Sequence, residues 1–340
     1  MNMTSMSASN KRVVVIGGGA AGMMAAGCAA EHGAAVTLLE PNDRLGKKLL
    51  ITGKGRCNVT NDCPWEDVLK NTPTNPRFLY SVLSRFSPTD AKAFFEVHGC
   101  ALTTERGNRV FPVSDRSADV LAALERYLRQ TGVQVRHARA TEIAVQDGAV
   151  CGVKTANGPI PADAVILATG GCSYPLTGST GDGYRMAAAL GHTIVEPVGS
   201  LVPLVERGHD CAAMQGLALK NVTLRLKNAK GKVVFEEFGE LLFTHFGLSG
   251  PIVLSASAHM DRKGEAFTVD LDLKPALDEK TLDERLLRDF EKYANRDFSH
   301  ALDDLLPRSM IPVVIKQSGI PARKRSTRSR SSSGARCWTS

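Results

Sequence analysis

The sequence predicts an α/β fold that begins with a parallel strand–helix–strand unit. Three observations near the N-terminus carry this prediction. Residues 13–16, VVVI, are uniformly apolar and β-branched, which is typical of a parallel strand buried on both faces. The run GGGAAG interrupts the strand, and residues 20–33 then have a helical composition that ends at Gly33. Residues 36–40, VTLLE, form a second strand, and a right-handed crossover joins the two.

The elements after residue 40 follow from periodicity and turn chemistry. Ser87 is expected to cap a helix that has Pro88 at its first position. The remaining elements are predicted in chain order as a loop at 41–64, helices at 76–86, 87–99 and 117–132, a hairpin at 103–112, an antiparallel meander at 133–158, a buried strand at 163–171, a helix at 184–190, hairpins at 222–244, a helix at 250–260, a strand at 267–275 and a helical stretch at 278–318.

The chain has 340 residues, enough for two domains. We expect a dinucleotide-binding domain at 11–195, a mixed second domain at 196–320 and a basic, disordered tail at 321–340, with a disordered start over the first ten residues. The tail holds six of the 42 basic residues and no acidic ones, so 36 basic residues face 35 acidic ones elsewhere. This nearly neutral body argues against a basic nucleic-acid-binding fold, and nucleic acid is not expected as a partner.

The eight cysteines include no C-x-x-C pair, which argues against a zinc site and against a secreted disulfide framework. A reducing cytoplasm is therefore the expected location. Residues 13–30 carry no charge, but much of this run is Gly and Ala. Because a membrane span needs about 20 strongly apolar residues, no membrane association is predicted.

The most specific motif is the glycine pattern between the first strand and the first helix. Gly17 permits the tight turn, Gly19 lets the backbone approach a pyrophosphate, and Gly22 lets helix and strand pack closely. The phosphates are then expected at the helix N-terminus, where free N–H groups and the helix dipole favour negative charge. Glu40 ends the second strand and is placed to accept hydrogen bonds from the adenosine ribose.

A second signal selects the dinucleotide. Residues 165–171, VILATGG, form an apolar strand that ends in Thr169, Gly170 and Gly171. Such a strand, far downstream of the glycine pattern, is typical of FAD enzymes of the glutathione-reductase-like superfamily. The two motifs together favour FAD over NAD and predict a Rossmann-like FAD-binding domain.

The segment 44–61, RLGKKLLITGKGRCNVTN, follows the ribose-binding acid and has two interpretations. Cys57 and Cys63 could form a redox-active disulfide against the flavin. The cysteines of flavin disulfide reductases, however, have four residues between them, and here there are five. The favoured interpretation is a cofactor cradle, in which Gly53 and Gly55 allow close backbone approach. Lys48 and Arg56 would offset phosphate charge. Asn58 and Thr60 would donate or accept hydrogen bonds in the cradle, and Cys57 would be a small residue near the flavin.

Five segments together resemble the BaiN-like (YhiN-like) family of NAD(P)/FAD-dependent oxidoreductases: GGGAAGMMAA, GKKLLITGKGRCNVTN, FPVSDRSADVL, LATGGCSYPLTGSTGDGY and LLFTHFGLSGP. The resemblance implies noncovalent FAD and an FAD domain interrupted by a β-barrel-like and helical domain. It also implies NADH or NADPH as electron donor. The family takes its name from a member assigned to reducing a double bond in a dehydro bile acid. The cofactor-binding residues implied by motif and resemblance are Gly17, Gly19, Ala20, Ala21, Gly22, Glu40, Lys48, Thr52, Gly53, Gly55, Arg56, Cys57, Asn58, Ala140, Thr169, Gly170, Gly171 and Asp182.

The expected function is therefore an FAD-dependent oxidoreductase that uses NAD(P)H to reduce an activated double bond in a small molecule. Two alternatives stay open: a flavin-containing nucleic-acid-binding protein, and an amine oxidase that uses oxygen. No metal is expected, and no catalytic acid or base is identified. His245 is interpreted as a structural cap, with a proton donor as the alternative. The family's closing glycine-rich return to the FAD domain is not found before the tail, so we expect a truncated or frame-shifted product.

Overall fold

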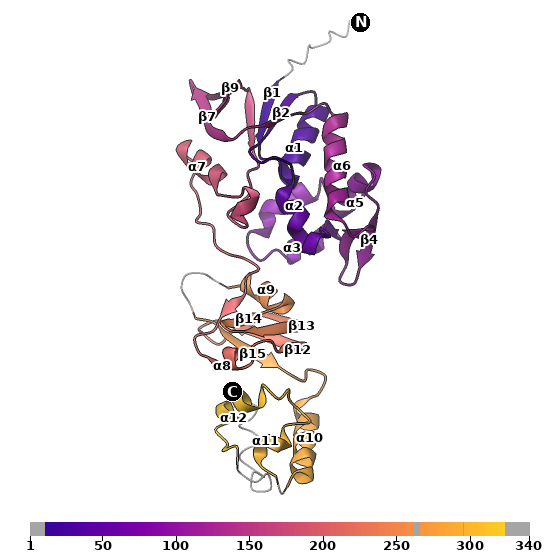
Figure 1. The fold of residues 1–340 in the computed structure, drawn as a ribbon, viewed down its shortest axis with the longest axis vertical. Helices are drawn as coiled ribbons and strands as arrows, with labels where there is room; N and C mark the ends of the chain where they lie inside the picture. Colours follow the sequence, from indigo (N-terminus) through magenta and orange to yellow (C-terminus); the bar gives the residue numbers. More distant parts are fainter. Residues whose placement is uncertain (1–10, 261–265, 295, 324–340) are drawn as a thin grey trace, which may run out of the picture. The chain divides into compact units, whose positions relative to one another are not determined.

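The computed structural model describes residues 11–260, 266–294 and 296–323 (Figure 1). The predictions of a disordered start and of a disordered end after residue 323 lie outside these ranges. The chain divides into two compact units, one ending at Pro197 and the next beginning at Val198.

A four-stranded parallel sheet forms the centre of the first unit. Its order is β10-β1-β2-β6, so the first strand lies between the second and the strand that precedes the Thr169 motif. Val14 of β1 is in register with Thr37 on one side and Val165 on the other. This arrangement brings the carboxyl ends of three strands to one edge. The strand bounds are β1 Arg12–Ile16, β2 Ala35–Glu40, β6 Gln134–His137 and β10 Ala164–Leu167.

Both faces of this sheet are covered, which explains the uniformly apolar first strand. Val13 and Val15 pack with α1 (Ala20–Glu31) and α6 (Ser117–Gln130), which lie side by side on one face (Figure 1). Val14 and Ile16 pack in a separate core with Ile143 and Val153. These two residues belong to the antiparallel sheet β7 (Ala140–Gln146), β8 (Ala149–Thr155) and β9 (Gly158–Pro161).

Three predictions for the first unit need correction. Residues 134–137 do not belong to the antiparallel meander; they form β6, which pairs in parallel with β2. Alternation of side chains cannot distinguish the two cases, because an edge strand and a hairpin strand share the same period. The predicted helix 76–86 is two short pieces, and the predicted loop 41–64 contains a helix and a short strand. The bounds are α2 Lys47–Ile51, η1 Thr52–Gly55, β3 Thr60–Asn61, α3 Trp65–Lys70, η2 Pro76–Leu79 and α4 Tyr80–Leu83.

Other predicted elements are confirmed within a few residues. The N-cap predicted at Ser87 is confirmed, and it is part of a capping box: the Ser87 hydroxyl accepts from the Asp90 N–H, and the Asp90 carboxylate accepts from the Ser87 N–H. Pro88 occupies the first helical position. The remaining bounds of the first unit are α5 Pro88–Val97, β4 Leu102–Glu105, β5 Arg109–Pro112, η3 Pro175–Thr177 and α7 Asp182–Ala189.

The second unit combines an antiparallel sheet with helices around one core. The sheet order is β11-β14-β13-β12-β15. These strands lie within residues 196–320, the range in which the β-barrel-like and helical domain is expected. His245 lies in the turn between β13 and β14, edge-on to Phe246. The bounds are β11 Leu204–Val205, α8 Asp210–Ala213, β12 Ala218–Lys227, β13 Val233–Thr244, β14 Gly247–Ser249, α9 Pro251–Ser257, β15 Thr268–Asp272, α10 Glu279–Lys292, α11 Phe298–Ala301 and α12 Ile311–Ser318.

Across the described residues, no helix has the length and apolar character that crossing a bilayer requires.

Candidate cofactor site

A cleft of about 490 Å³ opens at the carboxyl ends of β1, β2 and β10. In open α/β sheets this edge is where ligands bind. Five of the predicted residues do not line the cleft: Gly22, Gly53, Gly55, Arg56 and Gly171. The cleft is lined by thirteen of the eighteen predicted cofactor residues: Gly17, Gly19, Ala20, Ala21, Glu40, Lys48, Thr52, Cys57, Asn58, Ala140, Thr169, Gly170 and Asp182.

The three glycines of the turn after β1 have different surroundings. Gly17 has a φ of +109°, and a Cβ there would come 2.4 Å from the Ala168 carbonyl oxygen. A Cβ on Gly22 would come 1.8 Å from the Gly17 carbonyl oxygen, so this position sets the contact between α1 and the turn. A Cβ on Gly19 would meet no described atom within 4 Å. Gly17 and Gly22 therefore close the turn, whereas Gly19 presents bare backbone to the cleft.

The N-terminus of α1 presents hydrogen-bond donors to the same space. Gly19 is the N-cap and provides no side chain to accept from the first turn. The N–H groups of Ala20 and Ala21 have no acceptor within the helix, because the first turn of any helix lacks one. These donors and the helix dipole suit a pyrophosphate.

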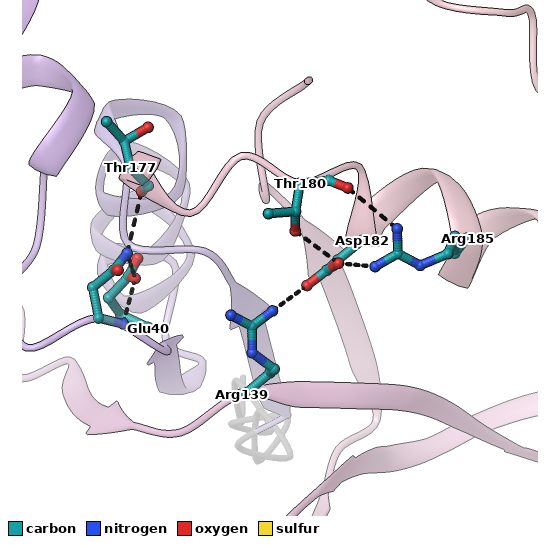
Figure 2. A network of polar contacts seen from close by, with 7 residues as sticks. Glu40, Arg139, Thr177, Thr180, Asp182 and Arg185 are labelled. Atoms are coloured by element: carbon teal, nitrogen blue, oxygen red, sulfur yellow. Dashed lines mark hydrogen bonds and ion pairs between the residues drawn. The ribbon is translucent and has the colours of Figure 1, made fainter. Parts of the chain in front are cut away.

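Glu40 is the acid that ends β2, and it is 7% exposed. It accepts the Gly18 N–H at 2.8 Å on Oε2, and the backbone N–H and side-chain amide of Asn42 at 2.9 and 2.6 Å on Oε1. A carboxylate has about four acceptor positions, so about one remains for a ribose hydroxyl. The Asn42 amide also donates to the Thr177 carbonyl at 3.2 Å, which ties the 172–181 loop to the Glu40 side of the cleft (Figure 2).

The other end of the cleft is formed by the 47–59 segment. Lys48 donates to the Ser173 hydroxyl at 3.3 Å, and Thr52 donates to the Leu49 carbonyl at 2.7 Å. Cys57 has a φ of +62° and is 7% exposed. Burial raises the pKa of the Cys57 thiol, so it stays protonated near neutral pH. Cys57 and Cys63 are both free thiols in this structure.

Arg56 does not line the cleft, and other groups engage its charge. Its guanidinium pairs with Glu105 at 2.5 Å and donates from Nε to Asp115 at 2.7 Å. It also lies 4.2 Å from the ring centre of Phe111. Glu105, and then Asp115, raise the pKa of Arg56. The prediction that Arg56 offsets phosphate charge is therefore corrected: its guanidinium lies outside the cleft and pairs with Glu105 and Asp115.

Asp182 lies at the start of α7 and is the centre of a polar network (Figure 2). Its carboxylate accepts from Arg139 at 2.6 Å, from the Thr180 hydroxyl at 2.9 Å and from Arg185.

Several residues that line the cleft were not predicted from the sequence. Some of them are next to predicted residues and could have been found by that adjacency: Ile16, Gly18, Leu39, Pro41, Lys47, Leu49, Val59, Arg139 and Ala168. The others have no predicted residue beside them in the chain: Asn42, Gly46, Phe95, Val120, Ala138, Thr177, Gly178, Ser179 and Met186.

Comparisons with known proteins place this architecture. The family model described as the HI0933-like protein Rossmann domain matches residues 11–289. The chain belongs to this family. It is 33% identical over 299 residues to a 3-dehydro-bile acid delta(4,6)-reductase of Clostridium scindens, covering 87% of this chain and 72% of that protein. It is 28% identical over 301 residues to a ribosomal RNA dihydrouridine synthase of Escherichia coli, covering 86% and 70%.

A solved structure of a flavocytochrome c3 fumarate reductase in an open conformation is similar at a TM-score of 0.46. It is 20% identical and covers 62% of this chain and 47% of that one. Family membership confirms the predicted resemblance, the Rossmann-like FAD-binding fold and the class of FAD-dependent oxidoreductase.

Three features of the cleft fit FAD. Gly19 leaves open the space that a phosphate needs, the α1 amides supply donors, and Glu40 retains acceptor capacity. The described residues include no group of three or more His, Cys, Asp or Glu side chains that could hold a metal ion.

Proposed function

We propose that this protein is an FAD-dependent reductase that uses NAD(P)H to saturate a carbon–carbon double bond conjugated to a carbonyl group. The observation that carries the proposal is the cleft at the ends of β1, β2 and β10, where Gly19, the α1 amides and Glu40 converge. When bound, FAD would accept two electrons and a proton from NAD(P)H and deliver a hydride to the acceptor carbon, while a proton completes the saturation.

The chemistry of the relatives supports the acceptor class. The Clostridium scindens relative is a delta(4,6)-reductase of a 3-dehydro bile acid, and in such a steroid the ring double bonds are conjugated to the 3-oxo group. The Escherichia coli relative makes dihydrouridine, and in uridine the bond that is saturated is conjugated to a ring carbonyl. Hydride addition to both substrates places the new negative charge on a carbonyl oxygen. Polarised double bonds are therefore the common acceptor.

Within this proposal the residues of the chain bind and orient the cofactor. Gly19 and the amides of Ala20 and Ala21 would hold the pyrophosphate, and Glu40 would accept from the ribose. Lys48 would lie toward the flavin, together with the 52–58 segment. The protonated Cys57 thiol would act there as a small, uncharged wall, since burial disfavours the thiolate.

A second candidate acceptor is a uridine in RNA. Two relatives that are each 28% identical, from Escherichia coli and Haemophilus influenzae, are ribosomal RNA dihydrouridine synthases. The conjugated-bond chemistry would be the same, and only the surface that binds the substrate would differ. The small-molecule acceptor is our first choice, because the relative with the higher identity acts on a bile acid.

Anaerobic reduction of the FAD-loaded chain tests the proposal. We expect NADPH or NADH to bleach the flavin absorption band, and an α,β-unsaturated ketone to restore it with formation of the saturated product. The saturated ketone serves as the matched control and must leave the flavin reduced. A uridine-containing RNA replaces the ketone in a parallel arm, with dihydrouridine as the product. If oxygen reoxidises the flavin but none of these acceptors does, an oxidase is favoured and the proposal is wrong.

A further inference from the structure

One buried hydroxyl group in the cofactor cleft lacks a hydrogen-bond partner. Ser179 lines the cleft and is 6% exposed. Three other serines in the described part of the chain are also buried, and each donates to a backbone carbonyl: Ser117 at 3.0 Å, Ser257 at 2.8 Å and Ser318 at 2.9 Å. The Ser179 hydroxyl has no such partner among the described residues. Because buried polar groups are nearly always hydrogen-bonded, we expect its partner to be a ligand in the cleft.

The residues on both sides of Ser179 are anchored. The Thr177 carbonyl accepts from the Asn42 amide at 3.2 Å (Figure 2). On the other side, the Thr180 hydroxyl donates to the Asp182 carboxylate at 2.9 Å. Ser179 is therefore held between two residues that have partners elsewhere in the fold, and its own hydroxyl is the polar group that this arrangement leaves over.

Two glycines show where this part of the loop lies at the edge of the parallel sheet. A Cβ on Gly170, which follows β10, would come 2.8 Å from the Ser179 hydroxyl oxygen. A Cβ on Gly178 would come 2.8 Å from the side-chain nitrogen of Asn42, which follows β2. In the sheet, β1 lies between β10 and β2. Gly178 and Ser179 therefore reach from one neighbour of β1 to the other, past the turn at 17–19 where the pyrophosphate is expected.

We propose that Ser179 donates its hydroxyl to the pyrophosphate of FAD, and that Asn42 is the positioning residue that holds Ser179 there. A phosphate oxygen carries charge, and a hydroxyl donates to a charged oxygen more strongly than to a neutral one. The hydroxyl would complement the N–H donors at the start of α1, which face the same cleft. The inference rests on the cofactor site of the proposed function and deepens it.

Asn42 is suited to hold the loop because of the way its side-chain amide is bonded. The amide nitrogen has two hydrogens. It donates to the Glu40 carboxylate at 2.6 Å and to the Thr177 carbonyl at 3.2 Å. The amide oxygen accepts from the Lys47 ammonium at 3.3 Å, which fixes the orientation of the amide. One side chain thus positions both the acid that ends β2 and the loop that carries Ser179.

Titration of the FAD-free full chain with FAD, followed by flavin fluorescence, tests the contact. In Ser179→Ala we expect FAD affinity to fall about tenfold, as for the loss of one hydrogen bond to a charged group. The unfolding midpoint of the FAD-free variant should not fall, because the hydroxyl that is removed has no partner in the folded chain. Ser117→Ala is the matched control. That serine is also buried but does not line the cleft, so its unfolding midpoint should fall and its FAD affinity should stay unchanged.

Displacement of bound FAD by ADP and by adenosine locates the contact on the cofactor. ADP contains a diphosphate group, whereas adenosine contains none. Ser179→Ala should weaken the binding of ADP by the same factor as that of FAD and leave the binding of adenosine unchanged. A loss for FAD without a loss for ADP would place the hydroxyl against the flavin half and overturn the assignment to the pyrophosphate.

A double-mutant cycle tests the role of Asn42. Asn42→Leu keeps the approximate size of the side chain but donates no hydrogen bond, so it should weaken FAD binding through both Glu40 and Ser179. When Ser179 is already alanine, the further loss from Asn42→Leu should be smaller, because only the effect on Glu40 remains. Losses that combine without any coupling would show that Asn42 does not position Ser179.

An unchanged FAD affinity in Ser179→Ala would overturn the inference. A lowered unfolding midpoint of that variant without FAD would also overturn it, because the hydroxyl would then be structural. Flavin reduction by NADPH or NADH, measured separately without oxygen, distinguishes failure of the reductase function. A chain that loses FAD affinity in Ser179→Ala, but whose bound flavin neither nicotinamide reduces, would refute the reductase function and leave the Ser179 contact standing.

Discussion

Alanine at Gly19 and at Gly22 is expected to separate cofactor binding from folding. The two glycines lie three residues apart at the start of α1, but their surroundings differ. A Cβ on Gly22 would come 1.8 Å from the Gly17 carbonyl oxygen, which is backbone and moves only if the turn moves. Helix propensity would favour alanine at that position by about 1 kcal/mol. Overpacking against backbone costs roughly 3 kcal/mol, so Gly22→Ala should be net destabilising.

Gly19→Ala should leave folding nearly unchanged. Gly19 has a φ of −77° and a ψ of −177°, which alanine adopts without strain. Alanine gains about 0.4–1 kcal/mol from a less flexible unfolded chain. It loses a similar amount, roughly 0.5–1 kcal/mol, as a poorer N-cap. The methyl group would instead project into the open space of the cleft, where we expect FAD affinity to fall about tenfold or more, or by about 1.4 kcal/mol.

Thermal unfolding of the FAD-free variants and titration with FAD measure the two effects. The expected result is a lowered unfolding midpoint for Gly22→Ala and a wild-type midpoint with weakened FAD binding for Gly19→Ala. A Gly19→Ala chain that binds FAD as tightly as wild type would refute the placement of the pyrophosphate. A Gly22→Ala chain with an unchanged midpoint would refute the packing argument.

Three further predictions concern single side chains. Glu40→Gln should weaken FAD binding about tenfold in a titration, because the glutamine NH2 cannot accept, so one oxygen is left to serve the Gly18 N–H, Asn42 and the ribose. Arg12 lowers the pKa of Asp163 to about 2, below the unfolded value of about 3.9. Stability from this pair is therefore present above pH 4 and lost as the pH falls toward 2; Asp163→Asn should lack that part of the acid dependence in unfolding curves. Cys57, being buried with a raised pKa, should react with iodoacetamide more slowly than exposed Cys172 at neutral pH, and equal rates would contradict this.

Local sequence patterns predicted the structure correctly where the conformation of a segment depends only on residues within that segment. The glycine turn, its preceding strand and its following helix lie within residues 12–31, and the structure has them as predicted. The capping box at Ser87 is likewise a local device, complete within four residues. Such features depend on backbone conformation and on neighbours along the chain, which sequence reasoning can evaluate directly.

Features that depend on distant partners were missed. Arg56 stands in a glycine-rich loop and resembles a phosphate-binding residue, yet its partners Glu105 and Asp115 are 49 and 59 residues away. Asp182 is paired with Arg139, 43 residues earlier in the chain. The parallel pairing of β6 with β2 could not be predicted from the sequence either, because the period-two alternation of side chains does not specify which strand is the neighbour.

The most direct test of the central claim is anaerobic reduction of the FAD-loaded chain, followed by addition of an α,β-unsaturated ketone. We predict that NADPH bleaches the flavin band, that the ketone restores it, and that one saturated product forms for each NADPH consumed. A flavin that NADPH and NADH both leave oxidised, or a reduced flavin that neither the ketone nor a uridine-containing RNA reoxidises, would contradict the proposed reductase.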